Sequence, residues 1–242
     1  MSFETIKPLE IHKIKKLIES KQVEELVECL QKLEIHTESI GVGGNAEVFG
    51  IKEGPFSKVC LKKVAKTPQI RCNDIDTETK IQSMARSAGV RIPLALVSFE
   101  SGGQEYLIME RIIGNTVGEI SASPSKLPEN FDPKLFMQKL IQMVERMHNA
   151  DIYHRDLHTN NVMVDSDGLP VIIDFGTAIH TPYSGGGDYA YEQLAWSYDN
   201  IKKNYIETPG IFKDDMVMVN NMKGSIAIAH TNNILTKRDN RL

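Results

Sequence analysis

The most constraining feature of this 242-residue chain is a pair of short apolar runs in its second half, with polar residues at their open ends. Residues 161–164 and 169–173 have the character of strands, and the turn-forming tetrapeptide Asp165-Ser-Asp-Gly168 joins them. Such an arrangement predicts a β-hairpin, because the second strand folds back along the first. The hairpin would bring Asn161 and Asp174 close together.

The first half of the chain predicts a helix followed by a sheet. Residues 9–33 place apolar side chains at steps of three and four, which is typical of an amphipathic helix. Short β-branched and aromatic runs follow, and they predict an antiparallel meander. These runs cover residues 40–44, 47–52, 58–64, 95–100 and 105–111. A helix over residues 76–88, ended by Gly89, is expected between the third and fourth runs. Its apolar face would hold Ile81, Met84, Ala85 and Ala88.

Beyond residue 111 the pattern becomes mostly helical. Residues 114–132 are rich in Gly, Ser, Pro and Asn and predict a linker, and residues 133–149 predict a helix. One more helix is expected over residues 189–205, whereas residues 206–242 show little periodicity. The expected domains are a helical extension over residues 1–38, a first lobe over 39–112 and a second lobe over 113–242.

Composition excludes several classes of protein. The chain is 41% hydrophobic and 25% charged, so it can bury a core. Its 28 basic and 32 acidic residues include no basic block, so a nucleic-acid partner is not indicated. Three cysteines without a CxxC pair argue against a disulfide framework and a zinc site. The charged amino terminus and the lack of a long apolar stretch predict a cytoplasmic protein outside the membrane, with secretion into a host cell left open.

A set of short motifs coincides with the predicted hairpin. His154-Arg-Asp156 matches H-R-D, Asn161 stands five residues after the aspartate, and Asp174-Phe-Gly176 matches D-F-G. These residues resemble the catalytic loop and metal-binding turn of the protein kinase superfamily. The resemblance extends from about residue 40 to 176, and it implies an α+β, two-lobed protein-kinase-like fold with a reduced C-terminal lobe.

The resemblance implies roles for the residues of this loop. Asp156 would orient an acceptor hydroxyl and take its proton. Asn161 and Asp174 would bind Mg²⁺, which prefers hard oxygen ligands. His158 stands where typical Ser/Thr kinases have a lysine. It would either donate to the γ-phosphate or only pack and hydrogen-bond within the loop.

A second group of residues would bind ATP. Strand alternation places Cys60 and Lys62 on one face, toward the interior, and a buried ammonium group needs a partner, for which Glu78 is the candidate. Because Val59-Cys-Leu-Lys62 resembles V-A-I-K, Lys62 would bind the α- and β-phosphates. The remaining expected nucleotide contacts are the backbone of Gly41, Gly43 and Gly44, the hinge positions Glu110 and Ile112, and the side chains of Val48, Cys60 and Met163 around the adenine ring.

The favoured function is therefore ATP- and Mg-dependent phosphoryl transfer to Ser or Thr of a protein substrate. Two observations keep a small-molecule kinase open, namely His158 and the run Ala88-Gly-Val-Arg-Ile-Pro93. Both are similar to compact atypical kinases, such as RIO and KEOPS-complex kinases, and to aminoglycoside and choline phosphotransferases. A third reading is a nucleotide-binding pseudokinase or ATPase scaffold whose N-terminal helices bind a protein partner.

Overall fold

The computed structural model describes residues 39–43, 45–50, 58–65, 73–101, 103–181 and 211–239, with backbone alone for 101, 211–214, 235 and 237–239. The helices expected over residues 9–33 and 189–205, and Gly44, lie outside the described residues. The chain divides into two compact units, Met1–Lys80 with Pro93–Ile112 and Ile81–Ile92 with Ile113–Leu242. No helix in the described ranges is both long and apolar enough to span a membrane.

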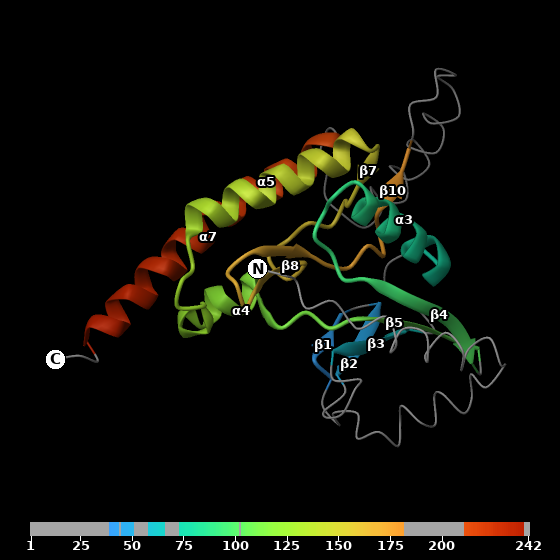
Figure 1. The fold of residues 1–242 in the computed structure, drawn as a ribbon, viewed down its shortest axis with the longest axis horizontal. Coiled ribbons are helices and arrows are strands. Elements are labelled where there is room, and N and C mark those ends of the chain that lie inside the picture. Colours follow the sequence, from blue (N-terminus) through green and yellow to red (C-terminus); the bar gives the residue numbers. More distant parts are fainter. Residues whose placement is uncertain are drawn as a thin grey trace. The chain divides into compact units, whose positions relative to one another are not determined.

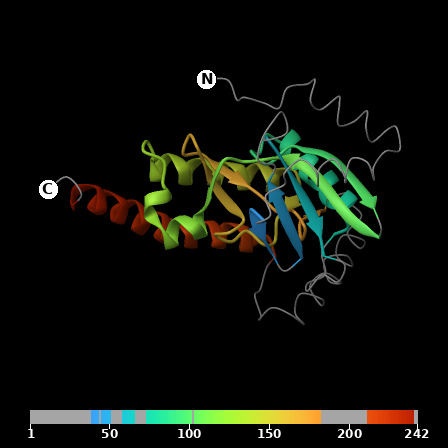
Figure 2. The ribbon, with the colours of Figure 1, turned by 90° about the horizontal axis from the view of Figure 1, so that it is seen from below.

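The first unit contains a five-stranded antiparallel sheet, visible in Figures 1 and 2. Its strands are β1 (Gly41–Val42), β2 (Ala46–Gly50), β3 (Val59–Val64), β4 (Ala95–Ser101) and β5 (Gln104–Glu110). The five predicted strands are confirmed, but the predicted meander is wrong, because the order is β1-β2-β3-β5-β4.

The position of β5 has a physical reason. Its central residues Leu107 and Ile108 are buried on opposite faces, which suits an inner strand, whereas β4 is mostly half-exposed and forms the edge. A helix separates β3 from β4, so no short turn joins these two strands. The tight connection joins β4 to β5 instead, where Ser101 pairs with Gln104.

The helix α3 (Ile75–Ser87) follows β3 in sequence and is limited by a cap at each end. Asp74 accepts the N–H of Thr77 at 2.7 Å at its start. At its end the N–H groups of Gly89 and Val90 donate to the carbonyls of Arg86 and Ala85, and Gly89 has a φ of 82°. This Schellman motif confirms Gly89 as the predicted stop.

The predicted apolar face of α3 is wrong at one position. Met84 is 37% exposed, while Ile81 and Ala85 are buried. The buried face passes through Glu78, Ile81 and Ala85 at steps of three and four, and position 84 lies about 100° around the helix from 85.

The second unit is mostly helical, with three short strands as a small sheet. Its helices are α4 (Val117–Ala122), α5 (Pro133–Asn149) and α7 (Ile211–Asp239), with a 3-10 turn η1 (Pro124–Lys126). The small sheet has the order β6 (Gly114–Thr116), β8 (Val162–Asp165) and β9 (Pro170–Ile172). A further antiparallel pair joins β7 (Ile152–Tyr153) to β10 (Ile179–His180).

The helix predicted over residues 133–149 is confirmed with the same bounds. Asp132 accepts the N–H groups of Lys134 and Leu135, and Pro133 occupies the first turn, where its missing N–H costs nothing. The buried side chains follow steps of three and four and pack into the core of this unit. They are Phe136, Met137, Leu140, Met143, Val144 and Met147.

The segment 114–132 is not the linker that its composition predicts. It contains β6 and α4, and Val117 and Ile120 are buried in the core of the unit. Thr116 and Glu119 form a reciprocal capping box at the start of α4. Small polar residues serve helix caps as well as linkers, so composition alone misassigned the segment.

The long helix α7 has no counterpart in the sequence predictions. It lies beside α5 (Figure 1). Its buried residues recur at alternating steps of four and three, which is the signature of one helix face. They are Asp215, Val219, Met222, Ile226, Ala229 and Asn233. Two polar residues and an alanine among these six weaken the apolar signal.

Candidate active site

The hairpin that carries the motifs is confirmed. β8 pairs with β9 in antiparallel register, with Val162 opposite Ile172. The N–H of Ile173 donates to the carbonyl of Asn161 at 3.0 Å, which continues the pairing to the open end. In the turn, the Asp165 carboxylate accepts the N–H groups of Asp167 and Leu169, and Gly168 has a φ of 78°. The hairpin therefore joins the loop of residues 154–161 to the Asp174 turn.

Asn161 is buried and bonds directly to Asp156. Its amide nitrogen Nδ2 donates to the Asp156 carbonyl at 2.8 Å and to the carboxylate Oδ2 at 3.2 Å. Because the nitrogen is committed to Asp156, the amide oxygen Oδ1 faces away from that residue. The oxygen is the atom of Asn161 that a cation could bind.

The environment of Asp156 makes its carboxylate a better proton acceptor. Burial raises its pKa, the charges of His158 and His154 lower it, and the nearby carboxylate of Asp174 raises it; the net pKa is above the usual value. A carboxylate with a raised pKa takes a proton more readily, which suits a general base.

Two residues of the site have left-handed backbone conformations that are uncommon outside glycine. Arg155 has a φ of 69° and Asp174 a φ of 64°. The Asp174 carboxylate accepts the N–H of Gly176 at 3.4 Å, which steadies the turn. Such conformations persist only where surrounding contacts hold them.

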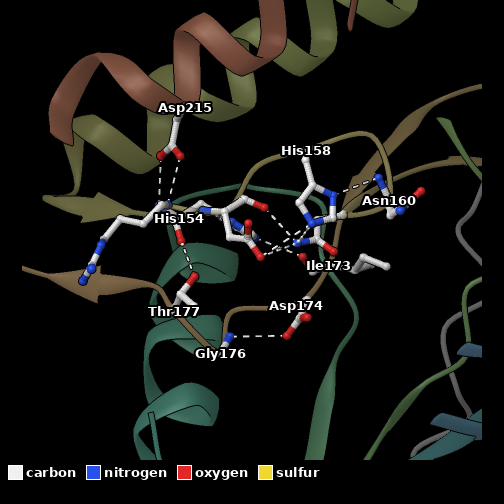
Figure 3. A network of polar contacts seen from close by, with 11 residues as sticks. His154, His158, Asn160, Ile173, Asp174, Gly176, Thr177 and Asp215 are labelled. Carbon is white, nitrogen blue, oxygen red and sulfur yellow. Dashed lines mark hydrogen bonds and ion pairs between the residues drawn. The ribbon is translucent and has the colours of Figure 1, made fainter. Parts of the chain in front are cut away.

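Asp215 of α7 holds the backbone of this loop, as Figure 3 shows. It is 1% exposed. Its Oδ2 accepts the N–H of His154 and its Oδ1 the N–H of Arg155, both at 2.9 Å, and Oδ2 lies 3.2 Å from His148 Nε2. Burial raises its pKa, but the hydrogen bond from His148, the charge of His154 and the two backbone donors outweigh burial, so the net pKa is lowered.

The sequence predictions missed Asp215. An acidic residue at the head of apolar positions spaced by four and three is the signal that could have indicated it. Asp215 is followed at such steps by Val219, Met222 and Ile226.

His154 is the inner residue of the loop. It is fully buried, its Nε2 lies 2.9 Å from the Ile173 carbonyl, and its ring meets the edge of Phe175 with centroids 4.9 Å apart. The hydroxyl of Thr177 donates to the His154 carbonyl at 3.1 Å. These contacts join the catalytic loop to the strand and turn that carry Asp174.

The first unit contains the predicted pairing of Lys62 and Glu78. Lys62 Nζ lies 2.6 Å from Glu78 Oε1, and the side chains are 7% and 5% exposed. The next residue, Lys63, is exposed, as strand alternation predicts. A carboxylate at this distance offsets part of the free-energy cost of burying an ammonium group.

The other predicted nucleotide residues have structural contacts of their own. Gly41 pairs with Val48, and the N–H of Gly43 donates to the Ala46 carbonyl at 2.9 Å. Burial raises the pKa of the Cys60 thiol to about 12, and its Sγ lies 3.7 Å from the Glu110 carbonyl. That carbonyl is the predicted adenine contact.

Ile112 ends the first unit and is half-buried, whereas Met163 of β8 belongs to the second.

Among the described residues, no group of three or more His, Cys, Asp or Glu side chains could bind a metal by itself. One acid and one amide suit Mg²⁺, which protein sites often bind through one or two ligands, with phosphates and water as the rest.

The fold and site define a class of protein. One unit has a five-stranded antiparallel sheet with the buried pair Lys62 and Glu78. The other has a hairpin that connects Asp156 and Asn161 to Asp174. These are the parts of a phosphotransferase of the kinase fold. Residues 35–196 match the family model described as Protein kinase domain. The chain belongs to the protein kinase family, and the predicted α+β kinase-like fold is confirmed.

The relatives that match the chain are named kinases and come from animals and from a bacterium. The chain is 31% identical over 139 residues to sperm motility kinase 2B of Mus musculus, covering 57% of this chain and 28% of the relative. It is 29% identical over 167 residues to serine/threonine-protein kinase D of Synechocystis sp., covering 64% of this chain and 32% of the relative. The matches thus span about a third or less of each relative.

Proposed function

We propose that this chain transfers the γ-phosphoryl group of ATP, with Mg²⁺, to a hydroxyl group of a protein. The observation that carries the proposal is the bonded cluster of Asp156 and Asn161 at the open end of the hairpin that leads to Asp174. Phosphoryl transfer needs a base for the acceptor hydroxyl and hard oxygens for a divalent cation, and this cluster supplies both.

Each residue has an assigned task in this proposal. Asp156 orients the acceptor hydroxyl and takes its proton. Asn161 and Asp174 hold Mg²⁺, which when bound neutralises negative charge on the phosphates. Lys62, kept charged by Glu78, binds the α- and β-phosphates. The rest of the nucleotide is bound by the backbone of Gly41, Gly43 and Gly44 and by Glu110, Ile112, Val48, Cys60 and Met163.

Protein Ser or Thr is the favoured acceptor because of the relatives. The Synechocystis protein is named a serine/threonine-protein kinase, and several others are named kinases. The position of His158 supports the alternative of a small-molecule acceptor, since it replaces the lysine typical of Ser/Thr protein kinases. The assay below distinguishes the proposed protein acceptor from this small-molecule alternative.

The test is transfer of labelled γ-phosphate from Mg-ATP to a mixed protein and metabolite extract, and to the chain itself. Wild type should label protein, and excess chelator should abolish labelling. Asp156→Asn and Lys62→Met should each reduce transfer by at least about 100-fold. Asp167→Asn, in the turn of the β8–β9 hairpin, and Lys63→Met, next to Lys62 on β3, change exposed side chains and should leave transfer unchanged.

The outcomes separate the candidate functions. Label found only on a metabolite would select a small-molecule kinase. An ATP-dependent rise in melting temperature without any transfer would select a nucleotide-binding scaffold and refute the proposed activity.

A further inference from the structure

The ring of His158 has a polar contact on each of its nitrogen atoms. Nδ1 accepts the backbone N–H of Asn160 at 3.1 Å. Nε2 lies 3.6 Å from the Asp156 carboxylate oxygen Oδ2 and 3.4 Å from the Asn161 amide nitrogen Nδ2. Figure 3 shows the ring of His158 beside Asn160.

These contacts determine which nitrogen carries the proton in the neutral ring. A neutral imidazole has one donor and one acceptor nitrogen. The backbone N–H of Asn160 can only donate, so Nδ1 must accept and Nε2 must carry the proton. The Asn161 amide nitrogen is also only a donor, so it cannot accept the Nε2 proton. Of the two groups near Nε2, Asp156 is the one that can accept.

We propose that His158 is a positioning residue for Asp156, acting through its Nε2–H, and that it does not serve as a γ-phosphate ligand. This inference rests on the proposed function. The Oδ2 of Asp156 then receives donors from both His158 and Asn161, and Oδ1 is left for the acceptor hydroxyl. Two donors on one oxygen limit rotation of the carboxylate and hold Oδ1 in one direction, which is what proton transfer requires. The 3.6 Å separation is long for a hydrogen bond, as is common in catalytic sites before substrate binds.

The backbone N–H of Asn160, which determines the tautomer of His158, is itself held in place by α4. The N–H of Gly118 donates to the carbonyl of Thr159 at 3.0 Å. A Cβ at position 118 would overlap the side-chain oxygen of Asn160, so glycine permits this close approach. The backbone of residues 159 and 160 is thus packed against a helix, while the His158 side chain is 38% exposed. Substitutions at 158 should therefore be tolerated by the fold.

The first test measures the tautomer without any need for activity. The full chain is labelled with ¹⁵N-histidine, and two-bond ¹H–¹⁵N spectra are recorded at a pH where the ring is neutral. The signal lost in His158→Gln assigns the residue. We expect a protonated Nε2 and an acceptor Nδ1. A protonated Nδ1 would overturn the proposal.

The second test uses two amides that imitate the two ring nitrogens. The Gln side chain places its amide near the position of Nε2, whereas the shorter Asn side chain reaches only the position of Nδ1. His158→Asn should lower kcat by about 10- to 100-fold with the KM for ATP unchanged, and His158→Gln should retain most of the wild-type kcat. Both variants should melt at the wild-type temperature.

Two results would refute the positioning role. Equal losses in the Gln and Asn variants would show that the Nε2 position is not what matters. A raised KM for ATP at unchanged kcat would indicate a direct phosphate contact. If wild type transfers no phosphate at all, the proposed function fails, while the NMR spectrum still decides whether His158 donates toward Asp156.

Discussion

Replacing Asp215 with Asn should damage the catalytic loop although Asp215 itself has no role in the proposed chemistry. The substitution keeps the shape of the side chain but leaves one oxygen where there were two. In the wild type, Oδ1 accepts a hydrogen bond from the N–H of Arg155. Oδ2 accepts one from the N–H of His154 and also lies next to His148 Nε2. Whichever way the amide turns, its NH₂ group faces a backbone donor that needs an acceptor.

The cost follows from burial. Asp215 is buried, so a donor left without a partner cannot turn to water. Losing a hydrogen bond to a charged acceptor and leaving a buried N–H unsatisfied should together cost about 2–4 kcal/mol. For a chain of this size, that corresponds to a fall in melting temperature of about 5–15 °C. Arg155, held at a φ of 69°, would lose its anchor, and the adjacent Asp156 would move. We expect kcat to fall by about 100-fold.

The assay compares Asp215→Asn with Asp167→Asn, an exposed aspartate in the hairpin turn. Thermal unfolding and phosphate transfer are measured for both variants and for wild type. The control should match wild type, because surface substitutions seldom change stability by more than about 0.5 kcal/mol. Melting of Asp215→Asn within about 2 °C of wild type, together with full activity, would refute the anchoring argument.

Three further predictions concern stability. Glu78→Ala should destabilise the first unit by about 3–5 kcal/mol in urea unfolding, because it removes the carboxylate that lies 2.6 Å from the buried Lys62 ammonium group. Lys126→Ala, which removes an exposed ion pair with Glu119, should cost at most about 1 kcal/mol, and equal losses would contradict the role of burial. Gly224→Ala should raise the free energy of unfolding by about 0.5–1 kcal/mol, because a Cβ at this position of α7 would meet open space. Gly114→Ala should lower it, because its Cβ would overlap the Val164 carbonyl. Urea unfolding that changes in the same direction for both variants would refute the role given to the space around each glycine. Because the pKa of Asp215 is lowered in the folded state, its ionisation stabilises the fold above the usual aspartate pKa of 3.8, and this contribution is lost as pH falls further. The difference in unfolding free energy between wild type and Asp215→Asn should therefore shrink as the pH falls below about 4, and a difference that stays constant from pH 5 down to pH 3 would disprove the linkage.

Local patterns in the sequence predicted much of the site. Alternation along β3 placed Lys62 toward the interior, and the cost of burying its charge indicated Glu78, which the structure has 2.6 Å away. The turn residues between β8 and β9 predicted the hairpin that links Asn161 to the Asp174 turn. Each inference depends on residues close in sequence or on a charge that must be neutralised.

Other features could not be predicted in this way. The position of β5 between β3 and β4 depends on which strand can be buried on both faces, a choice made among all five strands at once. Residues 114–132 resembled a linker because they are rich in Gly, Ser, Pro and Asn, yet Thr116 and Glu119 within this segment cap a helix whose apolar residues enter the core. Composition does not distinguish a polar residue in solvent from one that binds a backbone group.

The sequence by itself determined the hairpin, the helix over residues 133–149 and the acid and amide groups at 156, 161 and 174, because turns, helix periodicity and motif spacing are properties of neighbouring residues. Only the tertiary structure decided that Asp215, some sixty residues further along the chain, accepts the backbone N–H groups of His154 and Arg155. That contact forms because α7 packs into the core of the second unit, and no pattern local to either segment specifies which distant carboxylate will satisfy a buried donor.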